Sequence, residues 1–306
     1  MDAELIVDAR NTTGESPVWS AREQALYWVD IPARRLHRWH ATSNSSQSWE
    51  APQMLACIAA SPDGSWVAGM ENGLFRLTAS LDGDLQCSRL ASVNHAMPDM
   101  RFNDGRCDRQ GRFWAGTMHL NMSVAANVGS LYRYDGEKNT TLEARLNGLI
   151  VPNGLAFSPD GTVMYLSDSH PSVQTIWAFD YDIHSGTPSN RRVFVDMNQY
   201  PGRPDGAAID VEGGYWICAN DAGLIHRFTP QGKLDRSITL PVKKPSMCAF
   251  GGSNLDTLYV TSIRPSGDVS DQPLAGSVFA VQPGISGLEE TLFGTSGQSV
   301  QGNIER

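Results

Sequence analysis

Six repeats of one pattern constrain this chain more than any other feature of its sequence. Each repeat has a short turn followed by a bulky pair, and the pairs end at Trp28, Trp66, Trp114, Tyr165, Trp216 and Tyr259. Successive pairs are 38 to 51 residues apart, a spacing typical of β-propeller blades. The repeats therefore predict six small sheets arranged around one axis.

A run of alternating apolar and polar residues follows each bulky pair, as in 73–77 and 129–134. Such alternation is typical of half-buried strands, and sustained amphipathic helical patterns are absent. We predict an all-β, six-bladed propeller that forms a single domain over residues 1–306. Glu4–Ala9 and Leu288–Phe293 both have strand patterns, and we expect them to pair in one blade, which would cover two sheet edges.

Composition narrows the classes of partner and compartment. The chain has 24 basic and 33 acidic residues and a net charge of -9, which disfavours binding to nucleic acid. It shows no signal peptide and no apolar stretch long enough to span a bilayer, so we expect a cytoplasmic protein with no membrane partner. A monomer is the default for a closed propeller. The five cysteines lack CxxC spacing and are predicted to be free, mostly buried thiols.

One position recurs at the same place in every repeat, and we call it the slot. It lies five residues before a small or polar residue, and its occupants are Glu15, Ala56, Asn103, Asn153, Asp205 and Ser246. The first strand of a propeller blade lines the central channel, so these six side chains are expected to converge at one mouth. Loops after the second strands return to that mouth and carry His119, Asn121 and His170.

The slot has the composition of a site for a hard cation. Glu15, Asn153 and Asp205 offer oxygen donors, which suit Ca²⁺, Mg²⁺ or Mn²⁺ better than a metal that prefers thiolates. The alternative is a polar channel filled with water. Arg101 precedes the slot residue of its repeat by two positions, and we expect it to donate hydrogen bonds to a polyol or an anion. Its alternative is a surface ion pair with Asp99 or Asp104.

Four groups of residues resemble one known family, in order and over nearly the whole chain. They are Gly14–Trp19; Arg101–Gly105 with Gly116–Met118; Pro152–Ala156 with Ser158–Gly161; and Pro204–Gly206. At these residues the chain is similar to the senescence marker protein/gluconolactonase/luciferin-regenerating-enzyme-like family, which includes regucalcin and bacterial sugar lactonases. The resemblance implies a six-bladed propeller, in agreement with the repeats.

The resemblance also implies roles for individual residues. Glu15, Asn153 and Asp205 correspond to the three protein ligands of one divalent ion, for which Ca²⁺ is favoured and Zn²⁺, Mn²⁺ or Mg²⁺ are alternatives. Asp205 also corresponds to the general base, and Asn103 and Arg101 to contacts with the substrate. Regucalcin-like members have a Glu where this chain has Asn121, a difference that concerns the sugar preference rather than the metal site.

These observations lead to a hypothesis of metal-dependent hydrolysis of a sugar lactone. Glucono-, galactono- and arabinolactone are candidate substrates, and Arg101, Asn103 and Asn121 would hold their hydroxyl groups. The absence of a GxSxG motif from the sequence removes the usual serine esterase. Three alternatives stay open: a phosphotriesterase-like hydrolase on the same metal site, a non-catalytic calcium-binding or regulatory propeller, and a scaffold that binds partners on its face.

Overall fold

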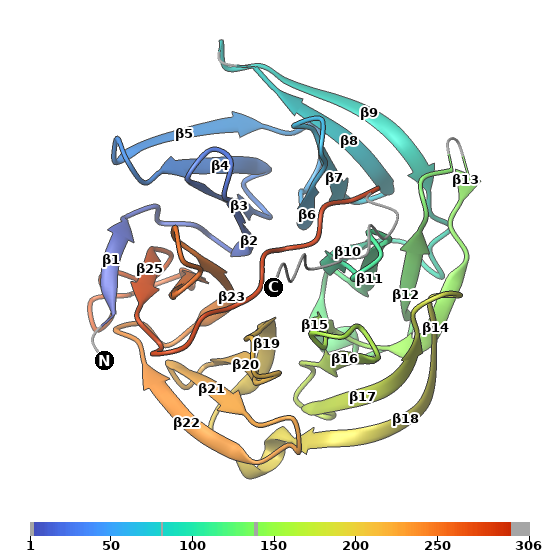
Figure 1. The fold of residues 1–306 in the computed structure, drawn as a ribbon. Coiled ribbons are helices and arrows are strands. Elements are labelled where there is room, and N and C mark those ends of the chain that lie inside the picture. Colours follow the sequence, from blue (N-terminus) through green and yellow to red (C-terminus); the bar gives the residue numbers. More distant parts are fainter. Residues whose placement is uncertain (1–2, 81, 138–139, 295–306) are drawn as a thin grey trace, which may run out of the picture.

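The fold is a closed ring of small antiparallel sheets, the blades of a propeller (Figure 1). The computed structural model describes residues 3–80, 82–137 and 140–294. Within these residues the chain forms six sheets around one axis, which confirms the predicted all-β, six-bladed propeller. The first strands of the blades contact one another in chain order around the ring, and the last first-strand contacts the first.

The first three blades use the following strands, from the axis outward. Blade 1 contains β2 (Gly14–Ser20), β3 (Ala25–Asp30), β4 (Arg35–His40) and β5 (Ser45–Glu50). Blade 2 contains β6 (Cys57–Ala60), β7 (Trp66–Gly69), β8 (Gly73–Ala79) and β9 (Leu85–Ser92), with the short β13 (Thr140–Thr141) parallel to its edge. Blade 3 contains β10 (Met100–Cys107), β11 (Phe113–His119), β12 (Gly129–Tyr134) and β14 (Ala144–Leu149).

The remaining blades complete the ring. Blade 4 contains β15 (Pro152–Phe157), β16 (Val163–Asp168), β17 (Thr175–Asp182) and β18 (Thr187–Asp196). Blade 5 contains β19 (Arg203–Ile209), β20 (Tyr215–Asn220), β21 (Leu224–Phe228) and β22 (Leu234–Thr239). Blade 6 contains β23 (Pro245–Gly251), β24 (Thr257–Ser262), β25 (Val278–Val281) and, at its outer edge, β1 (Glu4–Val7).

Strands from the two ends of the chain close blade 6, as predicted, but the partner of β1 differs from the expected one. Strand β1 pairs with β25, with Glu4 opposite Ala280. The segment Leu288–Phe293, which we expected to be that partner, contains no strand. It belongs instead to a segment that crosses the mouth of the channel opposite the slot, residues 282–294, which we call the C-terminal strap (Figure 1).

The strap buries more apolar surface by crossing the axis than it would at the edge of a sheet. Phe293 is 8% exposed and stacks on Tyr134 of β12, with ring centroids 5.5 Å apart. Burial of a Phe side chain stabilises a fold by about 1.5 to 3 kcal/mol, and an outer strand would leave much of that side chain in water. Glu290 pairs with Arg106 at 3.4 Å. Three backbone hydrogen bonds also link the strap to other blades, Val211 to Ser286, Phe293 to Ala60 and Gly294 to Gly111, and a fourth, Gly287 to Leu255, links it to blade 6.

The aromatic residues that mark the repeats lie between the blades. Tyr27 of blade 1 contacts Trp66 of blade 2 with ring centroids 4.4 Å apart, and Trp216 of blade 5 lies 6.2 Å from Phe250 of blade 6. The core is therefore a set of apolar layers between neighbouring sheets, while the axis is lined by the first strands. This arrangement explains why the bulky pairs recur once per blade.

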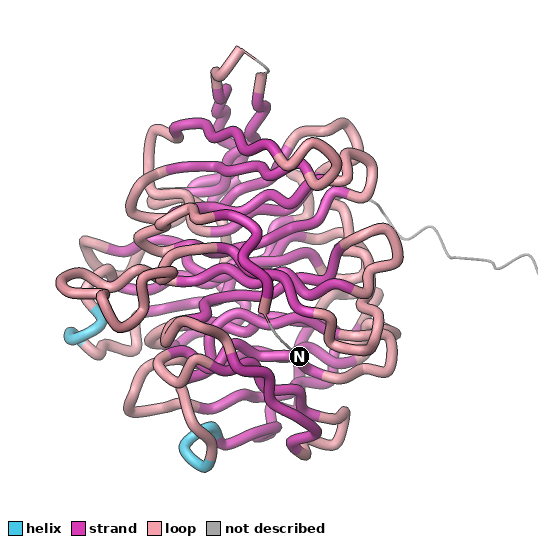
Figure 2. Tube along the Cα trace, turned by 90° about the vertical axis from the view of Figure 1, so that its left-hand side faces the viewer, coloured by secondary structure: helices cyan, strands magenta, loops and turns pink. Residues whose placement is uncertain are grey.

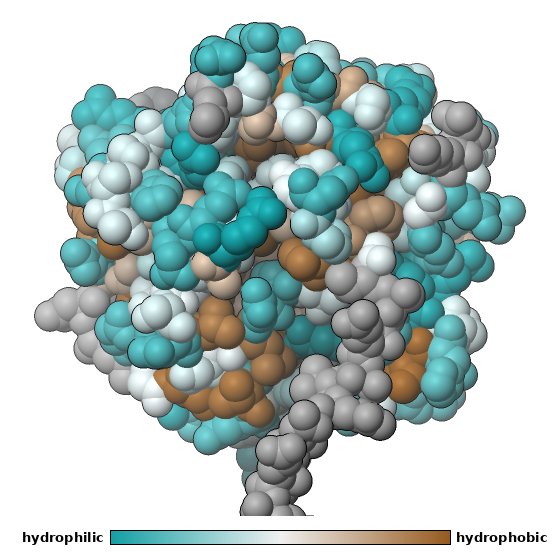
Figure 3. Space-filling model, turned by 45° about the horizontal axis from the view of Figure 1, so that its top comes forward, coloured by the Kyte–Doolittle hydropathy of each residue, from teal (hydrophilic) through white to brown (hydrophobic). Residues whose placement is uncertain are grey.

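The connecting loops lie on the two faces of the disc (Figure 2). Both short 3₁₀ helices, η1 (Met122–Val124) and η2 (Met197–Gln199), lie on the same face. On the side drawn in Figure 3, hydrophilic side chains predominate and apolar ones lie between them in smaller groups. Four cysteines are buried, Cys87 is half-buried and all five are free, as predicted. In the described part of the chain, no helix has the length and apolar character that crossing a membrane requires.

Candidate active site

The slot residues occupy equivalent places in the six blades, as the sequence predicts. All six are at most 9% exposed. In five blades the strand register shifts at the slot: the shift begins after Glu15 and Asn153 in two blades, and it includes the slot residue itself in the other three. A bulge changes the direction in which neighbouring side chains point, and Ser16 and Gly154, each directly after a slot residue, have positive φ angles of 49° and 60°. Blade 2, whose slot residue is Ala56, has no register shift between its first two strands.

Hydrogen bonds join Arg101, Asn103 and Asn153 into one cluster. Arg101 Nη1 donates to Asn103 Oδ1 at 2.8 Å and to the carbonyl oxygen of Phe102 at 2.7 Å. Asn103 Nδ2 donates to Asn153 Oδ1 at 2.9 Å. Asn153 Nδ2 in turn donates to Ser169 Oγ at 2.7 Å. The structure therefore brings these three predicted site residues together, and the expected alternative for Arg101, an ion pair with Asp99 or Asp104, does not occur among the described residues.

The two slot carboxylates, Glu15 and Asp205, have few partners. Asn220 Nδ2 donates to Asp205 Oδ2 at 2.6 Å, and the backbone N–H of Ser16 donates weakly to Glu15 Oε2 at 3.3 Å. Neither carboxylate forms an ion pair within 4.0 Å in the described ranges. Two buried negative charges thus share one mouth of the channel without a cationic side chain in contact.

Burial and nearby negative charges raise the pKa values of both acids. Burial raises the pKa of Glu15 well above its usual value, and the negative charges of Asp205 and Asp104 raise it further. Burial also raises the pKa of Asp205 to about 7, against the hydrogen bond from Asn220 and the charge of Arg203, which lower it. The pKa of Arg101 falls to about 10 because its side chain is buried. Carboxylates in this situation are stabilised by a cation placed between them.

Two other buried acids, Asp108 and Asp210, differ from Glu15 and Asp205 because cationic side chains as well as hydrogen-bond donors contact them. Both lie five residues after a slot residue and are fully buried. Asp108 pairs with Arg112 at 2.5 Å and accepts from the Tyr181 hydroxyl at 2.6 Å. Asp210 pairs with Arg227 at 2.7 Å and accepts from two backbone N–H groups and an indole N–H. These acids are compensated by the protein itself, whereas Glu15 and Asp205 are not.

The donor set at the slot fits a hard divalent cation. Glu15, Asn153 and Asp205 supply two carboxylates and one amide oxygen, so a divalent ion would be neutralised by oxygen ligands alone. Within the described residues no group of three or more His, Cys, Asp or Glu side chains is placed to bind a metal; this site contains only two such residues and depends on its amide. Ser246 is not available as a ligand in the same way, because its hydroxyl donates to the Gly14 carbonyl oxygen and contacts Thr261 Oγ1 at 2.9 Å.

The rim residues are less closely tied to the slot. Asn121 is exposed at the start of η1, where its Oδ1 accepts from the backbone N–H of Ser123 at 3.0 Å. It makes no hydrogen bond to the Arg101 cluster. His119 contacts the backbone of Asn121 at 3.1 Å, and His170 contacts Ser172 Oγ at 2.7 Å. The predicted contact of Asn121 with a substrate remains a prediction.

The structure adds three polar residues that the sequence analysis did not single out: Ser169, Arg203 and Asn220. Ser169 and Asn220 are almost fully buried and hold Asn153 and Asp205 by hydrogen bonds. Their loops were placed at this mouth, but a choice of residue requires the strand register. Arg203 could have been found, because it precedes the slot residue Asp205 by two positions, as Arg101 precedes Asn103.

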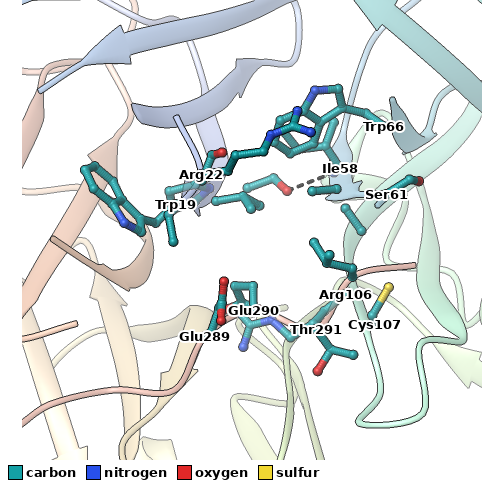
Figure 4. A pocket seen from close by; sticks show the side chains of 18 of the residues that line it. Trp19, Arg22, Ile58, Ser61, Trp66, Arg106, Cys107, Glu289, Glu290 and Thr291 are labelled. Atoms are coloured by element: carbon teal, nitrogen blue, oxygen red, sulfur yellow. Dashed lines mark hydrogen bonds and ion pairs between the residues drawn. The ribbon is translucent and has the colours of Figure 1, made fainter. Parts of the chain in front are cut away.

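A second hollow lies at the other end of the channel, near the ends of the first strands. Its walls include Trp19, Ile58 and Trp66, and the strap residues Glu289 to Leu292 cover one side (Figure 4). The lining is largely apolar, and its buried cation Arg106 is already paired with Glu290 at 3.4 Å. The hollow therefore lacks the uncompensated carboxylates that mark the slot.

Comparisons with known proteins agree with this geometry. A family model described as SMP-30/Gluconolactonase/LRE-like region matches residues 13–264. The chain is 40% identical over 291 residues to a 6-deoxy-6-sulfogluconolactonase of Pseudomonas putida, covering 94% of this chain and 97% of the relative. It is 33% identical to regucalcin of Danio rerio, covering 93% and 96% of the two chains.

A solved structure supports the same relationship. The structure of a calcium-binding protein, regucalcin, from Agrobacterium tumefaciens is similar with a TM-score of 0.86 at 27% identity, covering 95% of this chain and 97% of that one. With the family match extending over most of the propeller, the chain belongs to the SMP-30/gluconolactonase/LRE-like family.

Proposed function

We propose that this protein hydrolyses a sugar lactone to the open acid, with one divalent ion held by Glu15, Asn153 and Asp205. The observation that carries the proposal is the pair of buried carboxylates at the channel mouth, which have no cationic side chain in contact among the described residues. The names of the relatives, a sulfogluconolactonase and regucalcins, support the lactone class and a calcium-type ion. When bound, such an ion polarises a carbonyl group and offsets developing negative charge.

Asp205 is the residue best placed to handle a proton. Its Oδ2 is held by Asn220, which leaves Oδ1 to orient a water molecule and accept its proton. A base must be deprotonated at the working pH; without an ion, burial raises the pKa of Asp205 to about 7, and the charge of a bound divalent ion would lower that pKa and keep the carboxylate ionised. The oxygen of that water adds to the lactone carbonyl carbon, and the bond from this carbon to the ring oxygen breaks. The proton passes from Asp205 to the ring oxygen, and the product is a hydroxy acid.

Arg101 and Asn103 have different hydrogen-bonding capacities toward a substrate. Asn103 uses both amide hydrogens, on Asn153 Oδ1 and on the Pro152 carbonyl oxygen, so it can only accept from a sugar hydroxyl. Arg101 uses only Nη1 in its described hydrogen bonds, so Nε and Nη2 are free to donate. Arg101 is therefore the donor at this side of the mouth, and Asn103 mainly orients Arg101 and Asn153.

A panel of lactones tests the proposal. The panel contains glucono-, galactono- and arabinolactone together with 6-deoxy-6-sulfogluconolactone, and acid release is followed in the presence of Ca²⁺, Mg²⁺, Mn²⁺ or Zn²⁺. We expect turnover of at least one lactone well above its spontaneous opening. The similarity to a calcium-binding regucalcin favours a second candidate, a non-catalytic calcium-binding propeller. Tight binding of Ca²⁺ without turnover of any lactone would support that candidate and contradict ours.

The rim residue Asn121 is expected to influence which lactone is preferred. Its side chain is exposed and bonded only within its own loop, so Asn121→Ala should leave metal binding unchanged. We expect the ratio of kcat/KM between the best and the second lactone to change about three- to tenfold, the scale of one hydrogen bond. Steady-state kinetics on the panel measures this ratio. An equal loss on every lactone would contradict a role in sugar preference.

A further inference from the structure

A pair of cations shares a single carboxylate at the rim of the slot mouth. Arg203 Nε lies 2.6 Å from Asp221 Oδ2, and Lys244 Nζ contacts the other oxygen of Asp221. The side chains of Arg203 and Lys244 are 21% and 28% exposed. The group therefore carries one positive charge more than its acid compensates, and it is only partly open to water.

This cationic group adjoins the candidate metal ligands. Arg203 Nη1 lies 3.4 Å from the carbonyl oxygen of Ser169, and Nη2 lies 3.5 Å from Asn220 Oδ1. Ser169 and Asn220 are the residues that hold Asn153 and Asp205. One layer of side chains thus separates the Arg203 guanidinium from the atoms assigned to the ion.

Arg101 adds a second cation across the mouth. It extends from β10 of blade 3, opposite blade 6, where Lys244 lies just before β23. Its described partners are a carbonyl and an amide oxygen, with no carboxylate in contact. A divalent ion would neutralise Glu15 and Asp205, so the group of Arg203, Lys244 and Asp221 would keep its one surplus positive charge beside the loaded site, whereas the negative charge of Glu71 acts on Arg101. Partly buried charge of one sign is costly unless a counter-charge arrives.

We propose that Arg203 and Lys244 bind an anionic substituent of the lactone, a sulfonate, carboxylate or phosphate remote from the ring carbonyl. The inference rests on the proposed lactonase function and names its substrate class as acidic lactones. The planar guanidinium matches two oxygens of such a group, and the ammonium supplies a point charge beside it. The ring carbonyl then faces the slot, hydroxyl groups face Arg101, and the acidic end lies over blades 5 and 6.

A simpler role for these residues would be a tie between blades 5 and 6 through Asp221. A structural ion pair needs only one cation for one carboxylate. Neighbouring Lys243 forms such a pair with Asp271, and both side chains are more than half exposed. Lys243 is therefore the matched control, a rim lysine in the same loop with its own acid.

The test compares gluconolactone with its 6-sulfonated and 6-phosphorylated analogues. We expect the wild-type protein to prefer an anionic lactone at least tenfold in kcat/KM. Arg203→Met with Lys244→Met should lower kcat/KM for the anionic lactone, mainly through KM, at least about tenfold more than for gluconolactone, whose turnover the change at Arg203 also lowers because Arg203 contacts Ser169 and Asn220. Arg203→Lys, which keeps the positive charge, should lower kcat/KM for the anionic lactone less than Arg203→Met does. Lys243→Met should leave kcat/KM unchanged for both kinds of lactone.

The outcomes separate this inference from the function on which it rests. Equal use of neutral and anionic lactones by the wild type, or equal losses on both in the double variant, would overturn the inference and leave lactone hydrolysis standing. Turnover of neither kind of lactone would overturn both. Calorimetric titration with 6-sulfogluconate as the probe is a readout independent of turnover: at least tenfold weaker binding to a folded double variant supports the inference, and unchanged binding overturns it.

Discussion

Asp205→Asn is expected to lower kcat for the best lactone by about 1000-fold, the middle of the range for loss of a general base. The variant keeps the size of the side chain and a hydrogen-bonding partner for Asn220, yet it cannot accept a proton. Since Asp205 Oδ2 is already held by Asn220 at 2.6 Å, the loss should fall on the proton-transfer step more than on substrate binding. Initial-rate measurements at saturating metal concentration separate kcat from KM.

A nearby acid provides the control for this experiment. Asp99 lies on the same mouth, is exposed and has a positive φ of 58°, a conformation that Asn also tolerates. Asp99→Asn removes the same charge from the same face and should leave kcat within twofold. If Asp205→Asn retains more than a tenth of the wild-type turnover while still binding metal, Asp205 is not the base.

Metal removal is expected to have the second large effect, on activity and on stability together. Stripping the protein with a chelator should lower turnover at least about 100-fold, since polarisation of the carbonyl is worth several kcal/mol. Restoring an ion at 100 times its Kd should stabilise the fold by about 2.7 kcal/mol, or about 5 °C in Tm for a chain of this size. Calorimetry with and without Ca²⁺ measures the shift.

Glu15→Gln shows whether this shift arises at the slot. The variant removes one of two buried carboxylates that repel each other, so its metal-free form should be at least as stable as the metal-free wild type. It should also lose most of the increase in Tm on adding Ca²⁺. A full increase in this variant would place the stabilising ion elsewhere, and activity that survives complete metal removal would contradict the metal-dependent mechanism.

The sequence predicts the fold well because every blade packs against its neighbours in the same way, and the same residue pattern therefore recurs in each repeat. The bulky pairs lie between neighbouring blades, as Tyr27 and Trp66 do, and the slot recurs because every first strand starts at the same mouth. The strap was not predictable in this way. Its position depends on tertiary contacts, among them the stacking of Phe293 on Tyr134, the ion pair of Glu290 with Arg106 and the backbone hydrogen bonds of the strap, none of which leaves a local pattern.

The sequence predicts only part of the candidate site, because several of its contacts also depend on tertiary structure. The positions of the slot residues follow from the repeat, but the hydrogen bonds that join Asn103 to Asn153 depend on the register shifts at these two residues, and β-bulges have no strong sequence signal. Asn220 is the last residue of β20 and Ser169 directly follows β16; the general position of these strand ends was predicted, and the directions of their side chains were not. Arg203 repeats the offset of Arg101, so comparison of the repeats with one another would have found it.

The pairing of β1 with β25 also bears on how the protein forms. Glu4 lies opposite Ala280, so a ribosome must add about 275 residues after β1 before its partner exists. At about 5 to 20 residues per second this takes on the order of 15 to 55 seconds. During that time five blades can form in order behind an N-terminal strand that has no neighbour, and the ring can close only after β25 has been synthesised.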